Sequence, residues 1–250
     1  MTSALVELRV LEGPNLYFPR AAVKLTLDLT QLVEASEQVA RRFATRIGLR
    51  QVRPGDPGSG FRQRFAARAI GRLVRQIAGE AGTTRLAVRM RPTHDVHQVV
   101  VAYPWRHRLR AEALGRAVGD VLDGLAVPEL VDGPGSDLEA LVSAAAHAVR
   151  DSELGPGPTT LRPRVPVVAV TGTNGKTTTS RMIAHIAMVH GLHVGWSSTD
   201  GIYLDGELVE PGDYSGPSGA GRVLAYEQVQ LAVTETARGG ILLKGIGLTR

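Results

Sequence analysis

Short apolar runs alternate with segments of helical spacing over the last third of the chain. The β-branched run from Val165 to Val170 predicts a buried strand, and apolar residues recur at helical intervals from Thr177 to about His190. Further elements are expected in order: a strand at 192–196, a hairpin with arms at 202–204 and 207–209 that turns at Asp205-Gly206, a helix at 220–227 and a strand at 229–233. Alternation of strand and helix is typical of an α/β fold, so we expect a parallel sheet in a three-layer arrangement.

The first 150 residues mix strands and helices in a different way. The pattern predicts strands at 5–10, 23–29, 86–90 and 96–103, the last two as an antiparallel pair, and helices around 36–47, 61–77, 109–125 and 136–150. Thr30 or Ser36 is the candidate cap of the first helix, and Ser136 opens a capping-box sequence in the last. Phe61 lies on the apolar face of the second helix and Arg62 lies off it, which predicts an amphipathic surface helix.

A segment rich in glycine and proline separates these two patterns. It runs Glu153-Leu154-Gly155-Pro156-Gly157-Pro158-Thr159-Thr160, a composition expected where few contacts cross between domains. We therefore expect an N-terminal α+β domain over residues 1–150, a linker over 151–164 and an α/β domain over 165–250.

Composition and charge limit the classes of protein that fit. The chain has 250 residues, no cysteine and a formal net charge of +5, with arginines gathered at 41–75. These arginines alternate with apolar positions at helical spacing, and only 4% of residues are aromatic, so we expect a solvated helix face and no nucleic-acid partner. The lack of cysteine suits a reducing compartment, and no apolar run approaches the ~20 residues of a membrane span. We expect a cytoplasmic protein with no membrane partner.

The sequence TGTNGKTTT at 171–179 is the main candidate for chemistry. It stands between a predicted strand and a predicted helix, where backbone N–H groups and a helix N-terminus can surround phosphate oxygens. Lys176, one of only three lysines in the chain, can reach the outer phosphates of a nucleotide, and the Thr177 hydroxyl can bind Mg²⁺. The general P-loop pattern fails at one position, because Val170 stands where its first glycine belongs. The residues expected to hold the nucleotide are Thr171, Gly172, Thr173, Asn174, Gly175, Lys176, Thr177 and Thr178.

Other predicted strands also end in polar residues, and ligands bind at the carboxyl ends of parallel strands. Glu235 follows an apolar strand and is the best candidate for a metal-binding carboxylate, with a helix-capping role as the alternative. Asp200 follows another strand, but Asp-Gly is also an ordinary turn sequence, and both interpretations stay open. Lys176 and Glu235 are the predicted catalytic residues, and Thr177 and Glu235 the predicted metal ligands. The candidates for substrate contacts are Thr199, Asp200, Asp213 and Ser215.

Several segments together resemble the central ATP-binding domain of the Mur ligase superfamily. They are TGTNGKTTT at 171–179, SSTDGIYLDG at 197–206, GDYSGPSGA at 212–220 and ETARGGIL at 235–242. Within the superfamily they are most similar to the cyanophycin-synthetase group. The segments VLEGPNLYFPRAAVKLTLDL at 10–29 and VVVAYPWRHRLRAEALGRAV at 99–118 are similar to the N-terminal domain of that group.

The resemblance implies a ligase that uses ATP and Mg²⁺. In such enzymes a carboxylate becomes an acyl phosphate, which an amine attacks to give an amide or isopeptide bond. By resemblance, Lys176 binds the phosphates in transfer, Thr177 a first Mg²⁺ and Glu235 a second Mg²⁺ beside the acceptor carboxylate. The implied partners are ATP, a carboxylate acceptor and an amino acid or other amine, and a homo-oligomer is compatible with the sequence.

Two departures from the group shape the hypothesis. No ATP-grasp domain separates the N-terminal region from the Mur-like region, and the chain ends at Arg250, about halfway through the central domain, before the later motifs of the family. We therefore expect an N-terminal piece of a longer ligase that is inactive alone. The alternatives are a non-catalytic nucleotide-binding or interaction module, and an arginine-rich nucleic-acid binder that heparin would retain.

Overall fold

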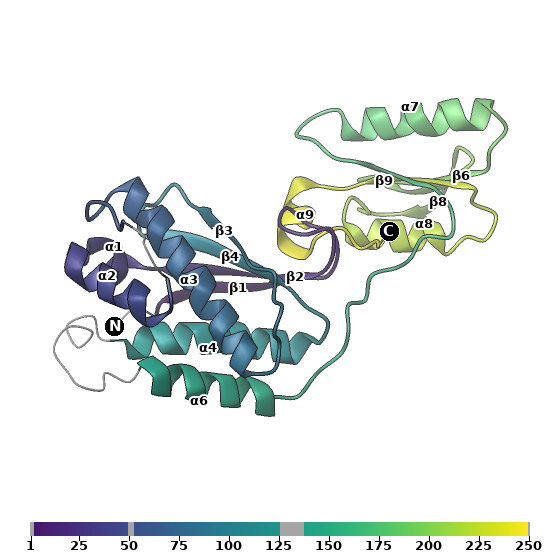
Figure 1. Cartoon of the computed structure of the whole chain (residues 1–250). Coiled ribbons are helices and arrows are strands. Elements are labelled where there is room, and N and C mark those ends of the chain that lie inside the picture. Colours follow the sequence, from purple (N-terminus) through teal and green to yellow (C-terminus); the bar gives the residue numbers. More distant parts are fainter. Residues whose placement is uncertain (1–2, 50–52, 126–137, 250) are drawn as a thin grey trace. The chain divides into compact units, whose positions relative to one another are not determined.

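The computed structural model describes residues 3–49, 53–125 and 138–249 (Figure 1). The chain forms two compact units, which are described separately. Unit 1 comprises Met1–Val10 and Ala22–Gly157, and unit 2 comprises Leu11–Ala21 and Pro158–Arg250. The chain crosses from unit 1 to unit 2 for the last time between Gly157 and Pro158, inside the glycine- and proline-rich segment. The inclusion of residues 11–21 in unit 2 has no signal in the sequence.

Unit 1 contains a four-stranded sheet in the order β1-β2-β4-β3. Its strands are β1 (Leu5–Leu11), β2 (Ala22–Asp28), β3 (Arg89–Pro92) and β4 (Gln98–Pro104). β4 is antiparallel to both of its neighbours, β2 and β3, which confirms the predicted antiparallel pair. Alternate residues of the central strands face the interior, so Leu25 of β2 lies opposite Val101 of β4 and both are fully buried.

The helices of unit 1 cover this sheet and pack on one another. They are α1 (Thr30–Glu34), α2 (Glu37–Arg46), α3 (Gly60–Glu80), α4 (Arg108–Gly124) and α6 (Leu138–Asp151). Ser36 and Ser59 precede α2 and α3, and each hydroxyl accepts a hydrogen bond from the backbone N–H of the third residue of its helix. Ser36 is thus the cap of α2, while Thr30 begins a separate short helix. The capping box predicted at Ser136 lies outside the described residues.

The amphipathic pattern predicted for α3 is confirmed, since Leu73 and Ile77 are buried while Arg68 and Arg72 are exposed, but two residues at its start depart from the pattern. Phe61, expected on the apolar face, is 51% exposed, whereas Arg62, expected in solvent, is fully buried. The guanidinium of Arg62 donates hydrogen bonds to backbone carbonyls, including those of Ala35 and Gly55 at 2.7 Å each. α3 contacts α1, β3, β4, α4 and α6, so protein surrounds more than one of its sides. No helix in the described part of the chain combines the length and the apolar composition that crossing a bilayer would need.

Unit 2 contains a five-stranded sheet in the order β5-β9-β6-β7-β8. Its strands are β5 (Val167–Val170), β6 (Val194–Ser197), β7 (Gly201–Leu204), β8 (Glu207–Pro211) and β9 (Leu231–Glu235). β5, β9 and β6 are parallel, and β7 and β8 extend the sheet as an antiparallel hairpin. The predicted hairpin is confirmed, and its turn residues Asp205 and Gly206 have positive φ angles of 49° and 100°. The sheet is mixed, so the prediction of a parallel sheet holds for three strands only.

Helices α7 (Lys176–Val189) and α8 (Pro217–Leu224) pack on opposite faces of this sheet (Figure 1). On one face Ala184 of α7 packs in a cluster with Trp196, and on the other Val223 of α8 packs in a cluster with Ala232. α8 begins at Pro217, before the predicted start, because proline suits the first position of a helix. A further short helix, α9 (Arg238–Lys244), was not predicted.

Residues 11–21 belong to unit 2 through backbone hydrogen bonds with the end of α9 and the segment after it. The N–H of Glu12 donates to the carbonyl of Lys244, and the N–H of Ile246 donates to the carbonyl of Pro14, each at 2.8 Å. Gly13 lies so close to the backbone of Ile246 that a β-carbon on it would stand 1.7 Å from the carbonyl oxygen. Only glycine fits this approach, which joins an early and a late part of the chain within one unit.

Candidate functional site

The loop between β5 and α7 has a geometry suited to phosphate. β5 ends at Val170, and α7 begins at Lys176. Gly175 precedes the helix at φ 76°, a left-handed conformation that favours glycine, although a β-carbon there would meet nothing within 4 Å. Thr173 and Asn174 are exposed, and the first turn of a helix has N–H groups with no partner inside the helix. The loop can therefore offer several N–H donors to one anionic ligand.

Three side chains meet where this loop enters α7. The Thr177 hydroxyl donates a 2.8 Å hydrogen bond to Oε2 of Glu235, and Nζ of Lys176 lies 3.9 Å from Oε1 of the same carboxylate. Glu235 is the last residue of β9 and is 1% exposed, whereas the Lys176 side chain keeps 19% of its surface in solvent. A buried carboxylate needs compensating partners, and a cation and a hydroxyl provide them here. The cluster joins a phosphate-type loop to an acidic group.

The register of the parallel strands brings this cluster together. Val170 of β5 lies opposite Glu235 of β9, and Ser197 of β6 lies opposite Thr234. The three strands therefore end at one edge of the sheet, and the N–H of Thr236 donates to the carbonyl of Val170 at 2.9 Å. This alignment places Thr177 beside Glu235 although 58 positions separate them in sequence.

The oxygens of Thr177 and Glu235 fit the requirements of Mg²⁺. Magnesium binds oxygen at about 2.0–2.1 Å in octahedral geometry, which places neighbouring ligand oxygens about 3 Å apart. The two oxygens are 2.8 Å apart, so they can be neighbours around one ion. Among the described residues, no three or more His, Cys, Asp and Glu side chains gather into a metal site. Magnesium commonly takes only one or two protein oxygens and completes its shell with water and substrate phosphates, so this pair suits it.

Thr199 and Asp200, which follow β6 and the buried Ser198, lie at the same edge and are exposed. Oδ2 of Asp200 accepts a 2.6 Å hydrogen bond from the guanidinium of Arg181 in α7, and that guanidinium also lies 5.9 Å from the ring centroid of Tyr203. The N–H of Asp200 donates to the hydroxyl of Ser198, so the turn chemistry anticipated for Asp200 is present too. Thr199 is exposed beside it. Arg181 was not predicted as a site residue, because its partner Asp200 lies 19 positions away and the sequence near Arg181 gives no sign of the pair.

The glycine-rich loop before α8 is tied to this edge by backbone hydrogen bonds. The N–H of Tyr214 donates to the carbonyl of Ser198, and the N–H of Ala237, just after β9, donates to the carbonyl of Ser215. Oδ1 of Asp213 accepts from the N–H of Ser215 at 2.9 Å, and this hydrogen bond lowers the pKa of the Asp213 carboxyl. Asp213 and Ser215 therefore shape the loop, and contact with a substrate stays a prediction for them.

Residues 170–242 match the family model of the Mur ligase middle domain. The matched segment begins at the last residue of β5 and includes both the phosphate-type loop and Glu235. This segment is similar to the Mur ligase middle domain, and the resemblance predicted from its motifs is confirmed.

Cyanophycin synthetases are among the relatives that match part of the chain. The enzyme of Crocosphaera subtropica is 57% identical over 83 residues, which are 33% of this chain and 10% of the relative. That of Trichormus variabilis is 54% identical over 84 residues, or 34% and 9% of the two chains. The UDP-N-acetylmuramoyl-L-alanyl-D-glutamate--2,6-diaminopimelate ligase of Wolinella succinogenes is 45% identical over 51 residues, or 20% and 12%. The chain thus spans about a tenth of the length of the relatives it matches.

Proposed function

We propose that the protein takes part in an ATP-dependent ligation, in which a carboxylate becomes an acyl phosphate and an amine then attacks it. The observation that carries this proposal is the meeting of Lys176, Thr177 and Glu235 at the end of the phosphate-type loop. Burying a carboxylate is costly even beside a cation, so the arrangement contributes little to the stability of the fold. Binding of a ligand at the loop explains it better. The match to the Mur ligase middle domain, and relatives that are named as ligases, support the same chemistry.

Each member of the cluster has a distinct role in this proposal. Lys176 binds the transferred phosphates, because its ammonium group is partly exposed at the N-terminus of α7. Thr177 and Glu235 would hold Mg²⁺, which neutralises charge that develops on the phosphates when it is bound. The N–H groups of residues 171–178 surround the phosphate oxygens. Glu235 also holds Lys176 and Thr177 at the mouth of the loop before a ligand arrives.

Unit 2 would act as the phosphate-binding part of a three-layer P-loop domain within a longer ligase. Its partners would be ATP, a carboxylate acceptor and an amino acid or other amine, with Thr199, Asp200, Asp213 and Ser215 as candidate substrate contacts. Unit 1 would correspond to the N-terminal domain of the cyanophycin-synthetase group.

Nucleotide binding is tested by calorimetric titration of the chain with ATP and Mg²⁺. We expect Lys176→Ala to weaken ATP binding by roughly tenfold or more, because it removes a charge-assisted contact to phosphate. Lys244→Ala is the matched control, since Lys244 is an exposed lysine of the same unit and its described hydrogen bond is made by its backbone carbonyl. Equal ATP affinity of the Lys176→Ala variant and the control would argue against the proposed loop.

Ligation itself is tested in the complete product of the gene that encodes this chain. Release of ADP is measured with a panel of carboxylates and amines, together and singly. Release that needs both a carboxylate and an amine supports the ligase. ATP binding without release in any combination would leave a non-catalytic nucleotide-binding module and would refute the ligase.

A further inference from the structure

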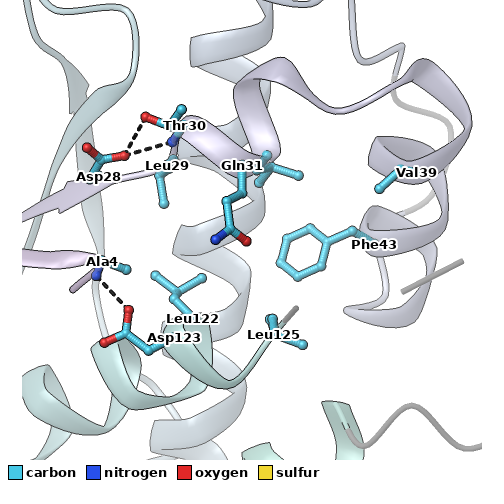
Figure 2. Close-up of a pocket in the computed structure, with 11 residues that line it drawn as sticks. Ala4, Asp28, Leu29, Thr30, Gln31, Val39, Phe43, Leu122, Asp123 and Leu125 are labelled. Atoms are coloured by element: carbon cyan, nitrogen blue, oxygen red, sulfur yellow. Dashed lines mark hydrogen bonds between the residues drawn. The ribbon is translucent and has the colours of Figure 1, made fainter. Parts of the chain in front are cut away.

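Unit 1 contains a cavity of about 280 Å³ to which the proposed ligation assigns no role (Figure 2). Its walls come from the end of β2, from α1 and α2, and from the end of α4. Much of the lining is apolar, with Phe43, Leu122 and Leu125 among its side chains. This volume lies near the lower end of the range for small-molecule sites, so it suits a ligand with a short carbon chain.

Two carboxylates stand at this cavity, and their described hydrogen-bond partners are neutral. Oδ1 of Asp28 accepts from the N–H and the hydroxyl of Thr30, at 2.8 and 2.7 Å. Asp123 accepts from the N–H of Ala4 at 2.6 Å and from the hydroxyl of Ser3 at 2.8 Å. These donors orient both carboxylates without cancelling their charge.

The lining itself offers these carboxylates no cation. None of the described residues that line the cavity is lysine, arginine or histidine. The cation that His97 forms on protonation lies within electrostatic reach of Asp28, but its ring is hydrogen-bonded to Glu34 at 2.7 Å. The cavity therefore combines an apolar lining with two negative charges that no described lining residue compensates.

The side chain of Gln31 adds a polar group inside the apolar lining. Figure 2 shows its amide extending between Leu122 and Phe43, with both aspartates to one side of these apolar side chains. No hydrogen bond joins this amide to another described residue. An amide in that position can donate to or accept from a ligand that lies along the lining.

We propose that this cavity binds a small organic cation, an ammonium or guanidinium group on a short aliphatic chain. The negative charges of Asp28 and Asp123 attract the cationic head, and the aliphatic chain packs against Phe43, Leu122 and Leu125. Charge selects the head, because a carboxylate at the same position would meet two like charges. This site is independent of the ligase proposal, since it lies in unit 1 and uses no residue of the nucleotide loop.

The probe for this site is n-pentylamine, titrated into the complete 250-residue chain at low salt and followed by methyl NMR of Leu122 and Leu125. We expect saturable binding of pentylamine, binding of 1-pentanol weaker by roughly tenfold, and no binding of pentanoate. Raising the ionic strength should weaken pentylamine binding and leave pentanol unaffected. Equal affinity for the amine and the alcohol, or no saturable shift with the amine, would overturn the proposal.

Substitution of the carboxylates tests which groups recognise the cation. Asp28→Asn and Asp123→Asn remove one charge each, yet asparagine keeps the oxygen that accepts from Thr30 or Ala4. We expect each variant to weaken pentylamine binding roughly three- to tenfold and to leave pentanol binding unchanged. Asp56→Asn, an exposed aspartate of the same unit, is the matched control. Unchanged pentylamine affinity in both cavity variants, with unfolding transitions like the wild type, would refute the site.

Discussion

Glu235 has almost no exposed surface, and both of its side-chain partners belong to the segment that opens α7. We predict that Glu235→Gln abolishes the effect of Mg²⁺ on ATP affinity, because the neutral amide can still accept from Thr177 but binds a cation poorly. The stability of unit 2 should change by no more than about 1 kcal/mol, since that hydrogen bond survives. ATP titrations with Mg²⁺ and with EDTA measure the effect.

The control for this substitution is Glu227→Gln, an exposed glutamate of the same unit. It should keep the full difference between titrations with Mg²⁺ and with EDTA. A Glu235→Gln variant that keeps this difference as well would remove Glu235 from the metal site and leave Thr177 as its protein ligand.

Arg62 is a second buried charged residue, and its role is structural. Its guanidinium serves the backbone carbonyls of Leu32, Ala35, Pro54 and Gly55. We predict that Arg62→Met lowers the free energy of unfolding of unit 1 by about 3–5 kcal/mol, because several buried carbonyls lose their donor at once. Arg68→Met, on an exposed position of the same helix, should change it by less than about 0.5 kcal/mol. Urea unfolding followed by the fluorescence of Trp105 measures both, and equal costs would contradict the role given to Arg62.

At the scale of single residues, the sequence predicted the features that depend only on residues nearby in the chain. The turn at Gly175, the lysine after it and the threonine at 177 follow from a strand, a turn and a helix in succession. The burial of Arg62 and the pairing of Arg181 with Asp200 depend on groups from other elements, so residue type and spacing could not reveal them.

At the scale of elements, an ion pair links α1 to the turn before β4. Nε2 of His97 lies 2.7 Å from Oε1 of Glu34, and this hydrogen bond raises the pKa of His97 above its ordinary value. A raised folded-state pKa stabilises the fold fully below the unfolded value of about 6.5, and the contribution is lost as the pH rises through the folded value. We predict that unit 1 has a higher melting temperature at pH 6 than at pH 8.5 by an amount that His97→Gln removes.

The matched variant for the pH measurement is Glu34→Gln, which should flatten the dependence in the same way. The side chains of His97 and Glu34 are 34% and 50% exposed, so the effect is expected to be small and to shrink in high salt. A pH dependence that persists in both variants would assign it to other groups.

Elements differ in how far their own sequence determines them. The hairpin at Asp205-Gly206 was predicted correctly, because only a few residue types accept its two positive φ angles. The buried and exposed faces of α3 were predicted correctly, but its apolar stripe does not show that contacts with other elements also bury Arg62. β7 and β8 turn a sheet expected to be parallel into a mixed one because strand order is a long-range property.

At the scale of the whole molecule, the two units do not correspond to two uninterrupted stretches of sequence. Gly13 lies between two strands of unit 1, yet it approaches the backbone of Ile246. We predict that Gly13→Ala destabilises unit 2 by about 2 kcal/mol or more and leaves unit 1 unchanged, because the new methyl group would collide with a carbonyl that cannot move alone. Hydrogen exchange of the Val233 and Leu25 amides reports on the two units separately.

The control for this substitution is Gly79→Ala in α3, where an added β-carbon meets nothing within 4 Å. It should leave unit 2 unaffected and stabilise unit 1 by up to about 1 kcal/mol, since alanine favours a helix more than glycine does. If Gly13→Ala increases the exchange rate, relative to the wild type, more at Leu25 than at Val233, that result would contradict the division into these units.

The hydrogen bonds of residues 12 and 14 with residues 244 and 246 have a consequence for synthesis on the ribosome. Residues 12 and 14 leave the exit tunnel long before their partners at residues 244 and 246. Strands β1 and β2 of unit 1 can pair before the loop between them has its hydrogen-bond partners in unit 2. A nascent chain stalled before residue 244 would therefore hold a folded unit 1 and an unclosed unit 2, an order of folding fixed by the position of eleven early residues, 11–21.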